Sequence, residues 1–313
     1  MYFGSVRFFK HIILSVVALL IVVPTTGFVY FAFQYNSLKT HTAKQVELMR
    51  AALANYEDEY DYDTRKRSSA FTVYASEQLQ AALNEVLPYH TKYPDLYVEN
   101  DFEYILETEK TIYLTFDDGP ANLTPHVLDI LKDRNVRATF FVVYKSGYEA
   151  RALYQRIIDE GHALGLHSAT HNYRNIYNSV DSFLEDMAVL SDMLENVTGV
   201  KPEILRFPGG SINSYNAGIY QGLIAEVIRR GYTYYDWDAS AVDTAGSATA
   251  DSIRSNVLNG ISGKQRAIVL MHDVGNSATV TALPGIIDSL EASGYQFEVL
   301  DKTIRPIRFD YPN

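Results

Sequence analysis

The 313-residue sequence contains no cysteine. Disulfide bonds and thiolate metal sites are therefore excluded, and a bound metal must be held by histidine, carboxylate or backbone oxygen. Positive charge is also scarce, because 27 lysines and arginines stand against 38 aspartates and glutamates, which gives a formal net charge of -11. Nucleic acid backbones are bound by clustered basic side chains, so this balance argues against nucleic acid as a partner.

Charged side chains are missing from one long stretch near the N-terminus. Residues 12–33 contain no charge and one proline, and at about 1.5 Å per residue they are long enough to cross a hydrocarbon core of about 30 Å. This run predicts a transmembrane anchor. A cleaved secretory signal is the alternative, although the run is long for one. Arg7 and Lys10 precede it, so residues 1–11 are expected in the cytoplasm and the remainder outside, in a single-pass protein of the cell membrane.

The next segment carries no repeat and no chemical motif. Apolar residues recur there at helical spacing after the membrane exit, which predicts a mostly helical extracytoplasmic stalk over residues 34–109. We expect a globular domain over residues 110–305 and a C-terminal tail over residues 306–313.

From residue 110 onward, short β-rich runs alternate with segments of helical period, which is typical of βαβ units. Seven strands are predicted, at 112–116, 138–143, 163–167, 204–207, 232–236, 267–271 and 297–300. Helices are predicted near 124–134, 149–160, 181–197, 217–230, 249–259 and 283–293, and a glycine closely follows four of them as a stop signal. This pattern predicts an α/β fold, a deformed seven-stranded (β/α) barrel, with an open doubly wound sheet as the alternative.

The chemistry is organised around residues 115–120, Thr-Phe-Asp-Asp-Gly-Pro. A predicted strand stops there in two adjacent carboxylates, because Gly and Pro end a strand by their backbone geometry. Taken alone, such a stretch is equally typical of a polar turn. Other polar residues also follow predicted strands, at the ends where the loops of a barrel converge on one rim. They are His167, His171, Arg206, residues 236–243 and His272. Their convergence predicts one site.

His167 and His171 form a His-x-x-x-His pair, a spacing that brings two imidazoles to one side of a turn. Alone, such a pair is also typical of surface or capping histidines. Together with Asp118 they provide two imidazoles and one carboxylate, the ligand set of a catalytic zinc ion that keeps one open position. We therefore predict a zinc site, with cobalt or another divalent metal as the alternative.

Attack by an activated water still requires a base, and Asp117 is the candidate. Arg206 is expected to orient that carboxylate by charge pairing. His272 is available as the acid that protonates the leaving group, and Asp243 as the carboxylate that holds the other ring nitrogen. The alternative for Arg206 is a surface strand-end charge, and for His272 a polar turn. Trp237, the only tryptophan, either lines a sugar groove or lies in the core.

Five motifs in this order resemble those of the polysaccharide deacetylases, carbohydrate esterase family 4, whose domain is also called the NodB-homology domain. They are Thr-Phe-Asp-Asp-Gly at 115–119, His-Ser-Ala-Thr-His at 167–171, Arg-Phe-Pro-Gly-Gly at 206–210, the run from Asp236 to Asp243, and Leu-Met-His at 270–272. The resemblance covers about residues 111–300. It implies a deformed (β/α) barrel that removes acetyl groups from N-acetylated or O-acetylated sugars with the help of zinc.

By position, the resemblance implies the same roles as the reasoning above. These are Asp117 as the base, Arg206 as its partner, His272 as the acid with Asp243 as its orienting carboxylate, and Asp118, His167 and His171 as the metal ligands. It adds that Leu270 forms part of a pocket for the acetyl methyl and that the backbone N–H of Gly209 donates to the oxyanion. The sequence departs from the family pattern at Leu166, where asparagine is common, and at Thr244, where tryptophan is common. Many members carry an aromatic residue in place of Gly209, which predicts a more open subsite here.

We therefore predict a membrane-anchored, metal-dependent deacetylase that acts outside the cell on a cell-wall or extracellular polysaccharide. Peptidoglycan N-acetylglucosamine is the most natural substrate, and a chitin-like glycan is another. An O-acetyl esterase acting on xylan or another polysaccharide is one alternative, since esters and amides pass through similar tetrahedral intermediates. A non-catalytic glycan-binding module that keeps the fold is the second. The sequence leaves the oligomeric state open.

Overall fold

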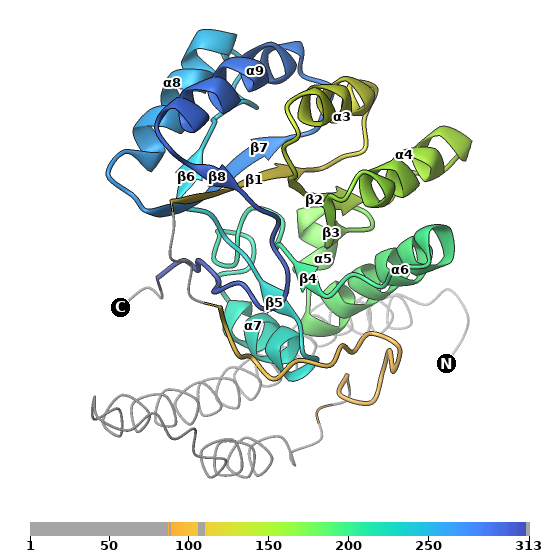
Figure 1. The fold of residues 1–313 in the computed structure, drawn as a ribbon. Helices are drawn as coiled ribbons and strands as arrows, with labels where there is room; N and C mark the ends of the chain where they lie inside the picture. Colours follow the sequence, from red (N-terminus) through yellow and green to blue (C-terminus); the bar gives the residue numbers. More distant parts are fainter. Residues whose placement is uncertain (1–86, 88, 106–109, 311–313) are drawn as a thin grey trace, which may run out of the picture. The chain divides into compact units, whose positions relative to one another are not determined.

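The computed structural model describes residues 87, 89–105 and 110–310, which belong to one compact unit (Figure 1). The predicted cytoplasmic tail, membrane anchor and most of the stalk lie outside the described residues. Within the described ranges, none of the helices combines the length and the apolar character that a membrane crossing requires.

One curled, all-parallel sheet forms the centre of the fold. In spatial order its strands are β5 (Thr233–Tyr234), β4 (Ile204–Leu205), β3 (Ala163–Ser168), β2 (Thr139–Val143), β1 (Thr111–Asp117), β7 (Arg266–His272) and β6 (Ala239–Ser240). An eighth strand, β8 (Gln296–Phe297), pairs with the first residues of β1. In the part of the chain that the structure describes, the end strands β5 and β6 are not paired with each other, so the barrel stays open.

The prediction of a deformed (β/α) barrel is confirmed as a curled, open barrel, but the number of strands was wrong. The sheet has eight strands, and the unpredicted one is β6. It contains only two residues and is recruited by pairing with Val269 and Leu270 of β7. A pairing of this kind depends on the neighbouring strand and leaves no periodic pattern in the sequence.

The longer helices form an arc on the outside of the sheet (Figure 1). The helices are α3 (Thr124–Asp133), α4 (Tyr148–Asp159), α5 (Tyr173–Ile176), α6 (Val180–Thr198), α7 (Tyr220–Arg229), α8 (Ala250–Ile261) and α9 (Ser277–Ala292). Five of the six predicted helices agree with the structure to within a few residues. The sixth, α9, was predicted to begin at residue 283 but begins at Ser277. It carries Pro284 in its interior, although a proline is normally tolerated only in the first turn of a helix. The one-turn helix α5 was not predicted.

Alternation along β1 sends neighbouring side chains into two different environments. Leu114 and Phe116 belong to the large core cluster that packs the sheet against the outer helices. Tyr113 belongs to a second cluster inside the curl of the sheet. Because residues two apart on a strand point to the same side, Thr115 and Asp117 face inward with Tyr113. The fold thus points Asp117 into the barrel at the carboxyl end of β1.

A segment that precedes the sheet packs against its β5 edge. Tyr89 and Leu96 are buried in the large core cluster. The guanidinium of Arg230 donates hydrogen bonds to four backbone carbonyls, those of Tyr89, Lys92, Tyr93 and Leu96. Its Nε donates to Glu226, which is also buried. Residues 89–98, which were predicted as part of the stalk, therefore pack onto this unit, and Tyr89 and Leu96 contribute to its core.

Candidate active site

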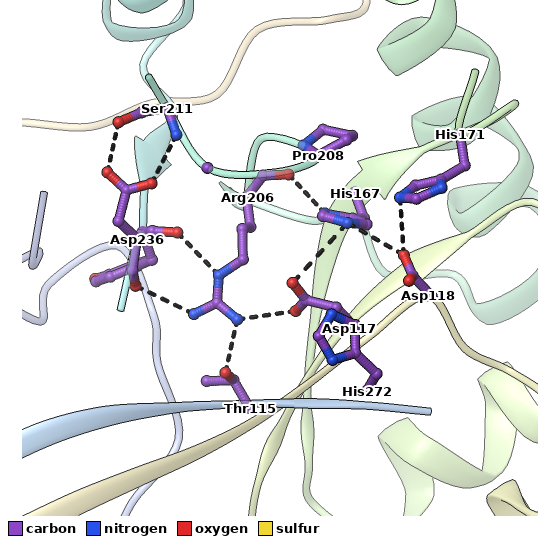
Figure 2. Close-up of polar contacts among 12 residues, drawn as sticks. Thr115, Asp117, Asp118, His167, His171, Arg206, Pro208, Ser211, Asp236 and His272 are labelled. Carbon is purple, nitrogen blue, oxygen red and sulfur yellow. Dashed lines mark hydrogen bonds and ion pairs between the residues drawn. The ribbon is translucent and has the colours of Figure 1, made fainter. Parts of the chain in front are cut away.

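The carboxylate of Asp117, the last residue of β1, is held by the buried side chain of Arg206, which follows β4 (Figure 2). Nη1 of Arg206 lies 2.8 Å from Oδ1 of Asp117 and also donates to the hydroxyl of Thr115 at 2.6 Å. The other guanidinium nitrogens donate to the carbonyls of Tyr235 and Asp236. Because all three guanidinium nitrogens donate hydrogen bonds, the guanidinium has one fixed orientation. It therefore also fixes the orientation of the Asp117 carboxylate.

Three possible metal ligands meet beside this pair. Ligand atoms of Asp118, His167 and His171 all lie within 4.8 Å of one another. Oδ1 of Asp118 is 3.3 Å from Nε2 of His167 and 3.0 Å from Nε2 of His171. The convergence that the sequence predicted is therefore present in the folded chain (Figure 2).

The donor set fits a cation. Nδ1 of His167 lies 2.8 Å from the backbone carbonyl of Arg206, and a carbonyl only accepts, so Nδ1 carries the proton. This tautomer leaves the lone pair of Nε2 directed at Asp118. Oδ1 of Asp118 is itself buried and receives no hydrogen bond. A lone pair and a carboxylate that face each other this closely are stabilised by a positive charge between them, as a bound divalent ion would supply.

Electrostatics couple the acidic and basic members of this cluster. Burial works against the ionisation of Asp118, but the two imidazoles outweigh it and hold the pKa of this carboxyl well below its usual range. Burial likewise disfavours a charge on His167, yet Asp117 and Asp118 together raise its pKa. The two aspartates thus favour a positive charge beside them, which is a proton on His167 when no metal is bound and would be the metal ion itself when one is bound.

Two of the possible ligands have an unusual backbone conformation. Asp118 has φ +71° and His171 has φ +53°, in the left-handed region. Such a conformation costs a non-glycine residue roughly 1–2 kcal/mol, and residues of this kind tend to persist at functional sites. The surrounding structure holds them in place, because the N–H of Asp118 donates to the carbonyl of Phe141 and the N–H of His171 donates to the hydroxyl of Ser168.

A residue that the sequence interpretation missed organises the loop between the two histidines. The buried carboxylate of Asp186, on α6, accepts hydrogen bonds from the hydroxyl of Ser168 at 2.6 Å and the N–H of Ala169 at 2.7 Å. Its other oxygen accepts from both the N–H and the hydroxyl of Thr170. One carboxylate thus shapes the whole connection from His167 to His171. A signal did exist, since an acidic residue on the apolar face of a helix is uncommon.

The second titratable pair lies on the other side of β1. Nδ1 of His272, at the end of β7, is 2.8 Å from Oδ1 of Asp243. The other oxygen of Asp243 accepts from the backbone N–H of His272 and from the hydroxyl of Thr279. Burial lowers the pKa of His272, but the hydrogen bond to Asp243 and the charge of Asp117 outweigh it, and the pKa is raised. The protonated imidazole is thereby favoured.

The residues predicted to bind substrate have different environments. Leu270 is in register with Thr115 and shares the inward face of β7 with His272, so it borders the site. Gly209 lies in the loop after β4 with φ +75°, a conformation that glycine adopts without strain. Trp237 packs against the inner core cluster, and its ring centroid is 4.9 Å from that of Phe309. This packing agrees with the core alternative for Trp237, and its role in sugar binding stays a prediction.

Asp236, the first residue of the fourth motif, fixes the loop that carries Gly209. Its carboxylate is fully buried and accepts from the N–H of Ser211 at 2.8 Å and from the hydroxyl of Ser211 (Figure 2). It also accepts from the N–H of Phe309, close to the end of the described chain. Burial raises the pKa of Asp236 despite these donors. The tail around Phe309 is thereby connected to the wall of the site.

Comparison with known proteins agrees with this geometry. The family model for polysaccharide deacetylase matches residues 106–224. A putative polysaccharide deacetylase of Bacillus subtilis, YheN, is 38% identical over 203 residues, which cover 64% of this chain and 70% of that protein. A peptidoglycan-N-acetylglucosamine deacetylase of Bacillus cereus is 33% identical over 210 residues, which cover 65% of this chain and 74% of that protein.

A solved structure extends the likeness to three dimensions. The catalytic domain of a peptidoglycan N-acetylglucosamine deacetylase from Eubacterium rectale matches with a TM-score of 0.64 at 33% identity, covering 67% of this chain and 97% of that one. The chain therefore belongs to the polysaccharide deacetylase family, carbohydrate esterase family 4, and is a hydrolase of that class. Enzymes of this class depend on a metal, and Asp118, His167 and His171 form a possible site for one.

Proposed function

We propose that this protein removes the N-acetyl group from N-acetylglucosamine residues of peptidoglycan, with zinc as its metal. The observation that carries the proposal is that two charge pairs and one cluster of possible metal ligands lie together in one site. These are the Asp117–Arg206 pair, the cluster of Asp118, His167 and His171, and the His272–Asp243 pair. Each corresponds to one requirement of amide hydrolysis, namely a base, a metal and an acid.

The metal would be held by Asp118, His167 and His171. A divalent ion bound there supplies Lewis-acid polarisation of the acetyl carbonyl and lowers the pKa of a water molecule to about 7. The protein contributes the proton transfers. Asp117, fixed by Arg206, accepts a proton from the attacking water.

The acid then completes the reaction. His272, kept protonated by Asp243, donates a proton to the sugar nitrogen as the carbon–nitrogen bond breaks. Acetate and a free amine are the products. The N–H of Gly209 is proposed as the donor to the oxygen that carries negative charge during attack, and Leu270 as part of the wall around the acetyl methyl.

The substrate is inferred from relatives and from the character of the chain. Two of the proteins described above, from Bacillus cereus and Eubacterium rectale, are named as peptidoglycan N-acetylglucosamine deacetylases. We further propose that residues 12–33 anchor the protein in the cell membrane with the catalytic unit outside, because this run is uncharged. An anchored enzyme suits an insoluble substrate beside the membrane. The full-length protein is then expected to sediment with membranes, and a variant that lacks residues 1–33 is expected in the soluble fraction.

The test of the activity is acetate release by the full-length protein loaded with zinc. We expect acetate from peptidoglycan and from N-acetylated chito-oligosaccharides, with a loss of one acetyl mass per event. The Asp117→Asn variant provides the background. Absence of acetate above that background on every N-acetylated glycan would contradict the proposal. Release confined to acetylated xylan would instead identify an O-acetyl esterase.

A further inference from the structure

An aromatic ledge extends from the candidate metal site toward solvent. The ring of Tyr173 lies 5.2 Å from that of His171 in an edge-on arrangement, and the ring of Tyr215 lies 5.0 Å from that of Tyr173. Tyr173 begins α5, and Tyr215 lies in the loop between β4 and α7. The two tyrosines thus come from separate loops and meet beside a possible metal ligand. We call Tyr173 and Tyr215 the aromatic ledge.

The ledge takes the space that the sequence predicted to be open. A Cβ placed on Gly209 would lie 2.8 Å from Cε1 of Tyr173, so a side chain at position 209 would point directly into this ring. The expectation of a more open subsite beside Gly209 is therefore wrong. The absent side chain at 209 leaves room for the ring of Tyr173.

The outer member of the ledge is both exposed and rigidly placed. Tyr215 is 56% exposed, so its ring is accessible to a ligand from solvent. Its loop is pinned by Asn213, whose side chain accepts from the N–H of Tyr215 and donates to the carbonyls of Pro208 and Gly210. The buried side chain of Asn216 closes the same loop onto Ser211 and Asn213. A fixed, exposed ring loses little conformational entropy when it binds a ligand.

We propose that the aromatic ledge binds the sugar ring that neighbours the acetylated residue in the glycan chain. A pyranose presents an apolar face of C–H groups, and a tyrosine offers an amphipathic ring that contacts such a face while its hydroxyl stays wet. The acetamido group must lie at the metal ligands, and the ledge starts at His171. The next sugar along the chain therefore lies over Tyr173 and Tyr215. This inference rests on the proposed function and specifies which part of the substrate the site grips.

The test compares substrates of different chain length. In the zinc-loaded full-length protein, Tyr215→Ala is expected to raise the KM for N-acetylchitotetraose about tenfold, as loss of one aromatic contact implies. The kcat is expected to change less than about twofold, and the KM for the N-acetylglucosamine monomer to change far less than that for the tetramer. Tyr215→Phe keeps the ring and is expected to retain the wild-type KM within about twofold.

A matched control is Tyr148→Ala, which removes an exposed tyrosine of α4 that is 86% exposed. It is expected to leave the KM for the tetramer unchanged. An unchanged KM in Tyr215→Ala, or an equal rise in Tyr148→Ala, would contradict the proposal that the aromatic ledge binds the neighbouring sugar. Calorimetric binding of chitosan tetraose separates this result from failure of the proposed function. If the wild type binds chitosan tetraose but releases no acetate from N-acetylchitotetraose, the proposed activity is wrong, and the proposal for the ledge then depends on whether Tyr215→Ala weakens binding of chitosan tetraose.

Discussion

Nη1 of Arg206 lies 2.8 Å from Oδ1 of Asp117, and the two side chains are 0% and 4% exposed. A charge pair this deeply buried depends on both partners, because removing one leaves the other without compensation. We expect Arg206→Met to destabilise the fold by about 3 kcal/mol and to lower kcat at least 100-fold. Thermal unfolding and acetate release on the same preparation check both effects.

Arg206→Lys is the informative companion. Lysine keeps the charge but cannot engage Asp117, Thr115 and two backbone carbonyls at once. Stability is expected to recover in part, while kcat stays low because Asp117 loses its fixed orientation. If Arg206→Lys restores full activity, the charge alone matters and the orienting role assigned to the guanidinium is incorrect.

The raised pKa of His272 makes a prediction about pH. Its folded pKa lies above the ordinary value of 6.5, chiefly because the hydrogen bond to Asp243 and the charge of Asp117 outweigh burial. A proton donor must be protonated, so kcat is expected to fall as the pH rises through the raised pKa. Asp243→Asn removes the charge that favours protonation, and the alkaline limb is expected to move to lower pH. A profile whose alkaline limb is unmoved in this variant would exclude His272 as the acid.

The same shift bears on stability. Because the folded pKa of His272 is raised, its contribution to stability is fully present below pH 6.5 and is lost as the pH rises through the folded pKa. Wild type and Asp243→Asn are therefore expected to differ more in thermal stability at pH 6 than at pH 9. Unfolding midpoints measured across this range provide the check.

Asp186 is expected to affect metal affinity indirectly, through the loop that presents His171. Asp186→Asn replaces one acceptor oxygen with an amide donor, which then faces donors of Ser168, Ala169 or Thr170. The loop that presents His171 is expected to relax, with a loss of about 10–100-fold in metal affinity and little change in the fold. Metal titration followed by calorimetry measures this. Unchanged affinity would show that the loop holds its shape without the carboxylate.

Much of this site could be predicted because its residues follow strands. β1 and β7 are long and buried, so their ends are marked in the sequence, and Asp117, Asp118 and His272 sit at those ends. The spacing of His167 and His171 then suggested the remaining ligands. The glycine stops were also correct, since Gly161, Gly199, Gly231 and Gly294 all have positive φ.

The missed features depend on contacts between distant parts of the chain. Asp186 acts on residues about 16 positions earlier, and Asp236 meets Phe309 from 73 positions away. The filling of the space beside Gly209 by Tyr173 is likewise a tertiary event. No local pattern specifies which buried carboxylate meets which loop, and this is why these residues were found only in the folded structure.

The most direct test of the central claim measures zinc content and acetate release on the same full-length preparations. Wild type is expected to hold about one zinc per chain and to release acetate from peptidoglycan, and His167→Ala to lose both. Asp117→Asn is expected to keep the zinc and lose turnover, since it is assigned to proton transfer. If His167→Ala retains metal and activity, or if Asp117→Asn loses zinc to the same degree as His167→Ala, the assignment of ligands and base is contradicted.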